Sequence, residues 1–231
     1  EDAEVAGRRL EEEFKLLQSV PHPHVVKALA FVTGPPMWMV MEFMDDGSLE
    51  KMCGKLRNWD LMHRVIIQSL RGLQHLHASN ILHRDLKPQN ILMRWESDGS
   101  LQVKIADFGI SKEYDEDANI DSTKAASTLM TTTMYAPNEV TRFPHKYSTK
   151  SDVYSWACCI AQLATGLHPT KFKNRPPTLD PLAMFLPYSA QDLAEVGLCL
   201  QPEVVELLMS CIHVQAAQRP DVDDLITSFN G

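Results

Sequence analysis

The fold of this chain is decided by two short stretches of its sequence, HRDLKPQN at residues 83–90 and DFG at residues 107–109. Each stretch contains a side chain with hard oxygen atoms, namely the amide of Asn90 and the carboxylate of Asp107. Magnesium ions in proteins are commonly held by one or two such groups together with phosphate oxygens. The two stretches therefore predict a site for Mg²⁺ and a phosphorylated ligand.

The first stretch also contains an acidic and a basic side chain that are not needed as metal ligands. Asp85 precedes Lys87 in a segment that we expect to be a loop between a helix and a strand. Asp85 is left free to orient a hydroxyl group, and Lys87 can neutralise charge that develops on a transferring group. An acid, a cation and two metal ligands make up a set suited to phosphoryl transfer.

On the N-terminal side of these stretches, the hydrophobic pattern predicts one helix and two strands. Apolar residues follow helical spacing over 10–20, and the run stops at Pro21, because proline disfavours helix in the residue before it. Two apolar stretches, 25–32 and 37–44, flank a Gly-Pro-Pro turn and are predicted to be strands. This part of the chain therefore combines a helix with a small sheet.

The rest of the pattern is mainly helical. Ser48 is a candidate cap for a short helix, and Asp60 is a candidate cap for a long one that ends at Ser79 and Asn80. Residues 81–106 contain two short strand-like pieces. Further helices are expected over 153–164, which is apolar all round and should be buried, and over 204–212 and 221–229. The order of elements predicts an α+β fold with a small mixed lobe and a larger helical lobe.

Composition excludes several classes of protein. The 231 residues are 44% hydrophobic and 23% charged, which is typical of a globular protein and not of a disordered one. The net charge of −8 argues against nucleic acid or an anionic membrane as the main partner. No stretch has the length and apolarity of a membrane span, and the N-terminus does not resemble a signal peptide. The chain lacks an initiator Met, which suggests a piece of a longer protein.

Cysteine and histidine usage adds little evidence for chemistry. The five cysteines are odd in number and form no CxxC pair, so we interpret them as small core residues in a reducing, intracellular and cytoplasmic environment. Four of the nine histidines occur as close pairs, 22 with 24 and 75 with 77, without a third ligand nearby in sequence. A metal site other than the one for Mg²⁺ is therefore not expected.

The two stretches resemble the catalytic loop and the metal-binding loop of eukaryotic protein kinases. The resemblance extends to MVMEFM at 39–44, similar to the strand that enters the hinge, SDVYSW at 151–156, similar to the buried large-lobe helix, and QRP at 218–220. It covers residues 10 to 229. Lys87 is typical of Ser/Thr kinases, and SDVYSW resembles the tyrosine-kinase-like group of these enzymes.

This resemblance implies a bilobal α+β fold with a truncated small β lobe and a complete, mainly helical large lobe. Residues 1–44 would form the partial small lobe, with helix C, strands 4 and 5 and the start of the hinge. Residues 45–231 would form the large lobe, which includes the catalytic loop and an activation segment at 107–139.

The resemblance also assigns roles to single residues in the reaction. Asp85 would accept or orient the proton of the substrate hydroxyl, and Lys87 would contact the γ-phosphate. Asn90 and Asp107 would hold Mg²⁺. Glu13 would be the helix glutamate that pairs with the strand lysine of the family.

The nucleotide implied by the resemblance is ATP. Glu42 and Met44 would present hinge backbone groups to adenine, with Met41 behind them as gatekeeper. Leu92 would lie under the adenine ring. ATP and Mg²⁺ are thus the expected cofactors, and a protein is the expected substrate.

The chain departs from the family pattern before Glu13. It contains no Gly-x-Gly loop and no Val-Ala-Ile-Lys strand there. Lys15 and Lys27 lie on elements that should not supply the missing lysine. An incomplete small sheet is expected to expose an edge and apolar surface.

Two features of the large lobe also bear on the resemblance. The family's Ala-Pro-Glu is Ala-Pro-Asn-Glu at 136–139, and Glu139 could still pair with Arg219. Thr128 lies where the activating phosphate of the family usually lies, and such a phosphate, added by an upstream kinase or by autophosphorylation, could pair with Arg84.

Two functions remain open at this point. The first is a protein Ser/Thr kinase domain that transfers the γ-phosphate of ATP to Ser/Thr hydroxyls, as a fragment of a longer active kinase. The second is a pseudokinase that binds and scaffolds other proteins without phosphotransfer. The intact residues 85, 87, 90 and 107 favour the first, and the absent glycine loop and lysine favour the second.

Overall fold

The computed structural model describes residues 3–107, 112–113, 134–141, 146–169, 193 and 200–230. The α-helices are α1 (Ala3–Ser19), α2 (Trp59–Ala78), α4 (Asn138–Thr141), α5 (Thr149–Thr165), α7 (Pro202–Cys211) and α8 (Val222–Asn230). The short 3-10 helices are η1 (Leu49–Met52), η2 (Pro88–Asn90) and η5 (Ala216–Gln218). The strands are β1 (Ala28–Val32), β2 (Trp38–Met41), β3 (Gly47–Ser48), β4 (Ile81–Leu82), β5 (Ile91–Trp95), β6 (Leu101–Ile105) and β7 (Lys112–Glu113).

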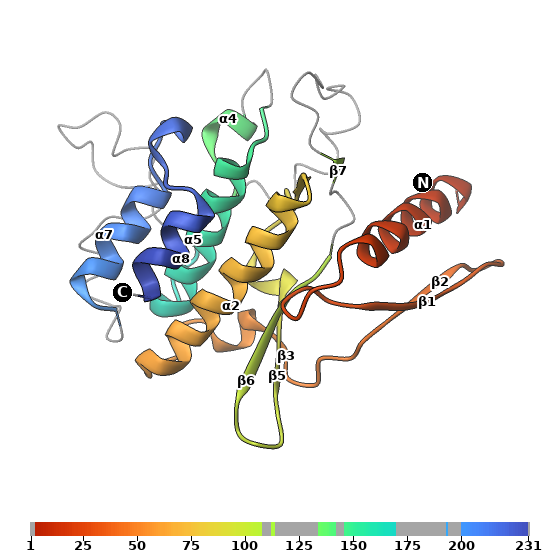
Figure 1. Cartoon of the computed structure of the whole chain (residues 1–231), viewed down its shortest axis with the longest axis horizontal. Coiled ribbons are helices and arrows are strands. Elements are labelled where there is room, and N and C mark those ends of the chain that lie inside the picture. The colour runs from red at the N-terminus through yellow and green to blue at the C-terminus, as the bar shows by residue number, and fades with distance from the viewer. Residues whose placement is uncertain are drawn as a thin grey trace.

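These elements form a small part and a larger helical part (Figure 1). Helix α1 lies beside the antiparallel β1–β2 hairpin on the right, and α2, α5, α7 and α8 gather on the left. The three-stranded sheet β3–β5–β6 lies between the two parts. This arrangement agrees with the α+β architecture of a mixed small lobe and a helical large lobe.

Strand β6 is the element that joins the two parts. From the small part, the loop before β1 pairs with it, because Val26 N donates to Ile105 O at 2.9 Å and Ile105 N donates to His24 O at 2.9 Å. From the large part, Gln68 of α2 donates to Leu101 O and accepts from Val103 N. The edge of β6 is thus satisfied by groups from both parts, which fixes the strand that leads to residue 107.

A glycine permits the close packing of α2 against this loop. A Cβ atom on Gly72 would lie 2.5 Å from the backbone oxygen of His24. No side chain fits in that space without moving the loop. The glycine therefore brings α2 against the segment that pairs with β6.

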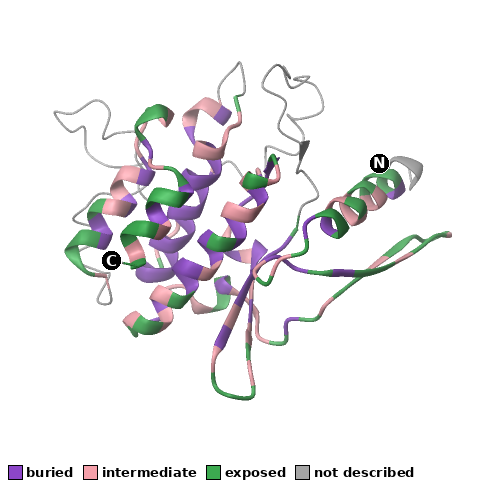
Figure 2. Cartoon of the chain, in the orientation of Figure 1, coloured by how far each residue is buried: buried purple, intermediate pink, exposed green. Residues whose placement is uncertain are grey.

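The core is centred on α5, as its apolar pattern predicts. Every residue from 151 to 165 is buried, which is visible as a continuous purple helix in Figure 2. Trp156 is fully buried, and its Nε1 donates to Ser69 Oγ of α2 at 2.9 Å. Cys158, Cys159 and Cys211 are free thiols within this core, which confirms their interpretation as small core residues.

The small part has an open apolar surface. Large apolar side chains on the hairpin and just after it are exposed, and Trp38 is the most exposed within β1 and β2 at 61%. The group comprises Leu29, Val32, Met37, Trp38, Val40, Met41 and Phe43. The exposure of apolar surface expected for an incomplete small sheet is therefore confirmed.

Three local predictions need correction. The cap of α2 is Asn58 and not Asp60, because the Asn58 side chain, on extended backbone, accepts from Leu61 N at 3.1 Å. Ser48 occupies the position before η1, but its side chain makes no capping hydrogen bond. Residues 25–27 were also predicted as strand, but Val25 and Val26 pair with β6, and only Lys27 pairs on the hairpin side, where its backbone oxygen accepts from Glu42 N, so β1 begins only at residue 28.

Candidate active site

The predicted catalytic loop, residues 83–90, runs from the end of β4 into η2, and it contains unusual backbone geometry. Arg84 has a φ of 68° and Asp107, just after β6, has a φ of 64°. Side-chain-bearing residues rarely adopt such angles, which cost of the order of 1–3 kcal/mol each unless surrounding contacts enforce them. The contacts around these two residues must therefore be strong enough to hold the strained backbone.

Asp152 of α5 supplies the contacts at Arg84. Its Oδ1 accepts from Arg84 N and its Oδ2 from His83 N, both at 2.9 Å. His77 of α2 donates to the same Oδ2 at 2.9 Å. Burial raises the pKa of this 1%-exposed carboxyl, but the His77 hydrogen bond and nearby charges outweigh it and hold the pKa below its ordinary value. An ionised Asp152 thus fixes the loop to the core.

The ring of His83 connects the loop to the end of β6. Its Nδ1 accepts from Asp85 N at 3.3 Å, so the neutral ring carries its proton on Nε2, which donates to Ala106 O at 3.0 Å. Burial lowers the pKa of this histidine against the opposing effect of Asp152. A neutral His83 therefore ties Asp85 to the residue before Asp107.

Asp85 has one engaged carboxylate oxygen and one open one. Its Oδ2 accepts from Lys87 Nζ at 2.7 Å and from Asn90 Nδ2 at 3.2 Å. Its side chain is only 7% exposed, and its buried Oδ1 has no hydrogen-bond partner among the described residues. A buried acceptor without a partner is unfavourable, so this atom favours a hydrogen-bond donor that the described residues do not supply.

Asn90 and Asp107 fit a magnesium ion that is shared with phosphates. Asn90 Nδ2 also donates to Asp85 O at 2.9 Å, so the amide nitrogen is engaged and the amide oxygen is left as an acceptor. Asn90 O accepts from Ala106 N, which brings η2 next to the residue preceding the exposed Asp107. An amide oxygen and a carboxylate are a donor set that Mg²⁺ uses when phosphate oxygens complete its shell.

The residues expected around adenine lie on β2, after it and on β5. Met41 ends β2 and is exposed, whereas Met44 is buried. Leu92 is half-buried on β5, and its cross-strand partner is Lys104 of β6. The side chain of Glu42 pairs with that same lysine. These positions connect the predicted hinge to the strand that leads to Asp107.

Sequence reasoning missed Asp152 and Lys104. Asp152 stands in a helix that is apolar all round, and an acidic residue in such a pattern is a signal of a buried, hydrogen-bonded carboxylate. Lys104 alternates with apolar residues along β6, which reads as a solvent-facing position. Only the arrangement of the strands shows that it is buried.

Other candidate residues are placed less completely. Glu13 is half-buried on α1, and Lys15 on the same helix pairs with Glu11 at 2.7 Å. The contact of Lys27 with Glu42 uses its backbone and not its ammonium. Phe108, Thr128 and most of the predicted activation segment lie outside the described residues.

The predicted pair of Glu139 and Arg219 is confirmed. Arg219 Nη1 and Nη2 donate to the two carboxylate oxygens of Glu139 at 2.6 and 3.1 Å. The arginine side chain is fully buried and also donates to the backbone oxygens of His213 and Lys150. The inserted Asn138 therefore does not disturb this contact.

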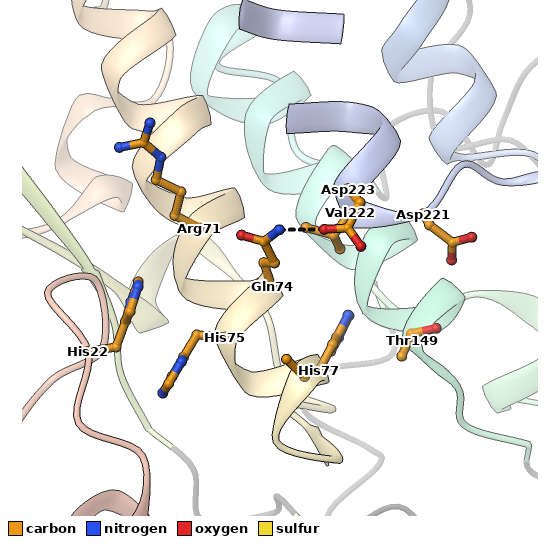
Figure 3. A pocket seen from close by; sticks show the side chains of 10 residues that line it. His22, Arg71, Gln74, His75, His77, Thr149, Asp221, Val222 and Asp223 are labelled. Atoms are coloured by element: carbon orange, nitrogen blue, oxygen red, sulfur yellow. Dashed lines mark hydrogen bonds between the residues drawn. The ribbon is translucent and has the colours of Figure 1, made fainter. Parts of the chain in front are cut away.

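Three of the four paired histidines line a cavity on α2. A cavity of about 580 Å³ lies between α2 and the start of α8, lined by His22, Arg71, Gln74 and His75 among others (Figure 3). The rings of His22 and His75 stack with centroids 4.6 Å apart. No group of three His, Cys, Asp or Glu residues suited to a metal occurs in the part of the chain that the structure describes.

In the part of the chain that the structure describes, no helix is long and apolar enough to cross a bilayer.

Comparison with known proteins identifies the family of the chain. A family model described as "Protein kinase domain" matches residues 1–228. Mitogen-activated protein kinase kinase kinase 3 of Arabidopsis thaliana is 30% identical over 240 residues, which cover 95% of this chain and 32% of that protein.

A second relative and a solved structure agree. Serine/threonine/tyrosine-protein kinase HT1 of Arabidopsis thaliana is 28% identical over 227 residues, which cover 94% of this chain and 54% of that protein. The Rad53 kinase domain and SCD2 in complex with AMPPNP superposes with a TM-score of 0.70 at 25% identity, over 94% of this chain and 77% of that one. The chain described here belongs to the protein kinase domain family.

Proposed function

We propose that this chain carries out the phosphotransfer step of a protein Ser/Thr kinase, with ATP and Mg²⁺ as cofactors. The observation that carries the proposal is the state of Asp85, whose Oδ2 is held by Lys87 and Asn90 while its buried Oδ1 has no partner among the described residues. A hydroxyl group of a protein substrate would complete that hydrogen bond. The names of the two Arabidopsis relatives, both protein kinases, support the same activity.

The chemical step follows from these positions. Asp85 Oδ1 aligns the Ser or Thr hydroxyl and takes its proton as the oxygen–phosphorus bond forms. The bond between the γ-phosphorus and its bridging oxygen breaks, and ADP leaves. Lys87, which lies next to Asp85, counters the negative charge on the transferring group.

The remaining proposed roles concern ligand binding. Asn90 and Asp107 would hold Mg²⁺, which when bound neutralises charge on the phosphates. Glu42 and Met44 would offer backbone groups to adenine, with Met41 behind them as gatekeeper and Leu92 under the ring. Glu13 would pair with a lysine ammonium, as the family pattern implies. We propose a site of action inside the cell, where free thiols such as Cys158 and Cys159 are kept reduced.

Regulation by phosphorylation is part of the proposal. The guanidinium of Arg84 stacks over the ring of Tyr147 at 5.1 Å, and its buried Nε has no hydrogen-bond partner among the described residues. A phosphate on Thr128, added by an upstream kinase or by autophosphorylation, would supply an acceptor for this donor. Replacement of Thr128 by Ala should then leave nucleotide binding intact and reduce turnover.

The test begins with ATP binding. Calorimetry measures Mg²⁺-dependent binding of ATP to the 231-residue chain and to the natural protein in its full length. Binding to the full-length protein supports the proposal. A full-length protein that binds no ATP contradicts it and supports a scaffold that does not transfer phosphate.

Turnover then tests the role of Asp85. In the full-length protein, Asp85→Asn should lower the turnover number by roughly 10²–10⁴-fold, the usual contribution of a general base, with little change in ATP affinity. The matched control is Asp60→Asn, an exposed carboxylate at the start of α2, which should behave as the wild type. Turnover close to wild type in Asp85→Asn would refute the assignment.

A further inference from the structure

The inference concerns Lys104, a buried lysine on β6. Its Nζ lies 2.6 and 2.8 Å from the two carboxylate oxygens of Glu42. The two side chains are only 9% and 17% exposed. Burying opposite charges is unfavourable unless they are paired and hydrogen-bonded, so this pair must be well compensated where it lies.

Glu42 is held from a second side as well. Its Oε1 accepts from Lys27 N at 2.7 Å, and its own N donates to Lys27 O at 2.9 Å. Lys27 follows Val26, whose N donates to Ile105 O of β6. Backbone and side chain of Glu42 are therefore fixed by one closed set of contacts that begins and ends on β6.

The position of Lys104 links both ends of the proposed nucleotide site. In the antiparallel register it is the direct partner of Leu92, so the two side chains project from the same face of the sheet. Lys104 pairs with Glu42, the residue that immediately follows β2. Lys104 also lies three residues before Asp107, which follows the end of β6 at Ile105. One side chain thus contacts the predicted hinge, lies beside the predicted floor of the adenine site and belongs to the strand that leads to a predicted metal ligand.

We propose that Lys104 is a positioning residue for adenine recognition. By holding the Glu42 side chain, it fixes the orientation of the Glu42 peptide and hence of the carbonyl that accepts the amino group of adenine. The proposal rests on the proposed function, because it requires that this carbonyl meets the nucleotide base.

The chemistry of the bases makes the effect selective. Adenine carries an amino donor where guanine carries a carbonyl oxygen. A rigid backbone carbonyl accepts a hydrogen bond from the amino group of adenine. It repels the carbonyl oxygen of guanine, because two acceptors then face each other. A carbonyl that is free to rotate discriminates less, so loss of the Lys104 contact should weaken ATP binding more than GTP binding.

Stability alone does not account for the pair. A buried ion pair is often replaced by apolar residues without loss of stability. The surroundings are largely apolar, since Lys104 borders a cavity of about 330 Å³ lined by residues such as Leu17, Val20 and Val26. The same cavity leaves room for a longer cation, so Lys104→Arg is a conservative variant that retains the charge.

The experiment measures dissociation constants for Mg²⁺–ATP and Mg²⁺–GTP on the natural protein in its full length. Its variants are Lys104→Met, Lys104→Arg, Glu42→Gln and the double variant of Lys104→Met with Glu42→Gln. The preference for ATP over GTP should fall roughly tenfold in Lys104→Met and in Glu42→Gln, and no further in the double variant, because residues that act as a pair are not additive. Lys104→Arg should retain most of the preference.

Lys15→Met is the matched control, because it removes the ammonium of an exposed Lys–Glu pair on α1. Urea unfolding of each variant shows whether it is folded. If Lys104→Met is not folded, the preference of Glu42→Gln for ATP over GTP tests the positioning role instead. An unchanged preference, or equal losses for ATP and GTP, overturns the positioning role. A wild-type protein that binds neither nucleotide overturns the proposed function instead, so the two failures are distinguishable.

Discussion

Replacement of Asp152 by Asn tests how the catalytic loop is held. The carboxylate accepts from Arg84 N on one oxygen and from His83 N and His77 on the other. An amide offers one acceptor and turns an NH₂ group toward a backbone N–H. The variant therefore loses one charge-assisted hydrogen bond, worth about 1.5–3 kcal/mol, and leaves one buried donor without a partner. We expect a loss of roughly 2–4 kcal/mol in the free energy of unfolding.

The same change should reduce catalysis beyond its effect on folding. The two backbone hydrogen bonds enforce the positive φ of Arg84, and Asp85 is the next residue. With one of them lost, the strained backbone can relax and displace Asp85. A displacement of about 1 Å can lower a rate by the order of 10²-fold, so turnover should fall by that order under conditions where the variant is folded.

The pH dependence provides a second readout. The folded pKa of Asp152 lies below its unfolded value, so the folded state binds fewer protons. Its ionised form stabilises the protein above a pH of about 4, and this contribution is lost as the pH falls through the folded pKa. Asp152→Asn should lack this part of the acid dependence.

Urea unfolding at pH 7 and at successively lower pH, with turnover measured in parallel, checks all three expectations. Asp60→Asn serves as the control, since it removes an exposed carboxylate. A loss below about 0.5 kcal/mol, which is the range of ordinary surface substitutions, together with unchanged turnover would refute the reasoning.

Three further predictions concern other residues. Asp107→Asn should weaken Mg²⁺-dependent ATP binding, measured by Mg²⁺ titration at fixed ATP, and an unchanged metal dependence would contradict its role. Arg219→Met should lower the free energy of unfolding in urea by about 3–5 kcal/mol, because Glu139 then keeps a partly buried charge without its partner, and a loss under 1 kcal/mol would be inconsistent with that. Burial, with the charge of His75, lowers the pKa of His22 to about 4, so the protein should lose stability between a pH of about 6.5 and 4. His22→Gln should flatten that dependence in urea unfolding, and an unchanged slope would show that His22 is not responsible.

The sequence by itself predicted the features that depend on neighbouring residues in the chain. The helical spacing of apolar residues marked α1, the all-apolar pattern marked the buried α5, and residues 83–90 marked the loop that brings Asp85, Lys87 and Asn90 together. These predictions succeeded because periodicity and short motifs are local. The pair of Glu139 and Arg219 was also predicted, although from a family pattern and not from spacing.

The tertiary structure decided which polar residues are buried and what they contact. Asp152 and Lys104 stand far in sequence from their partners His83 and Glu42, so no local pattern indicates either contact. Likewise, Val25 and Val26 are as apolar as a strand of the hairpin, but β6 offers them a free edge and they pair there instead. The physical reason is that burial and strand pairing depend on elements distant in the chain, whereas the pattern of residues along the sequence reports only on local structure.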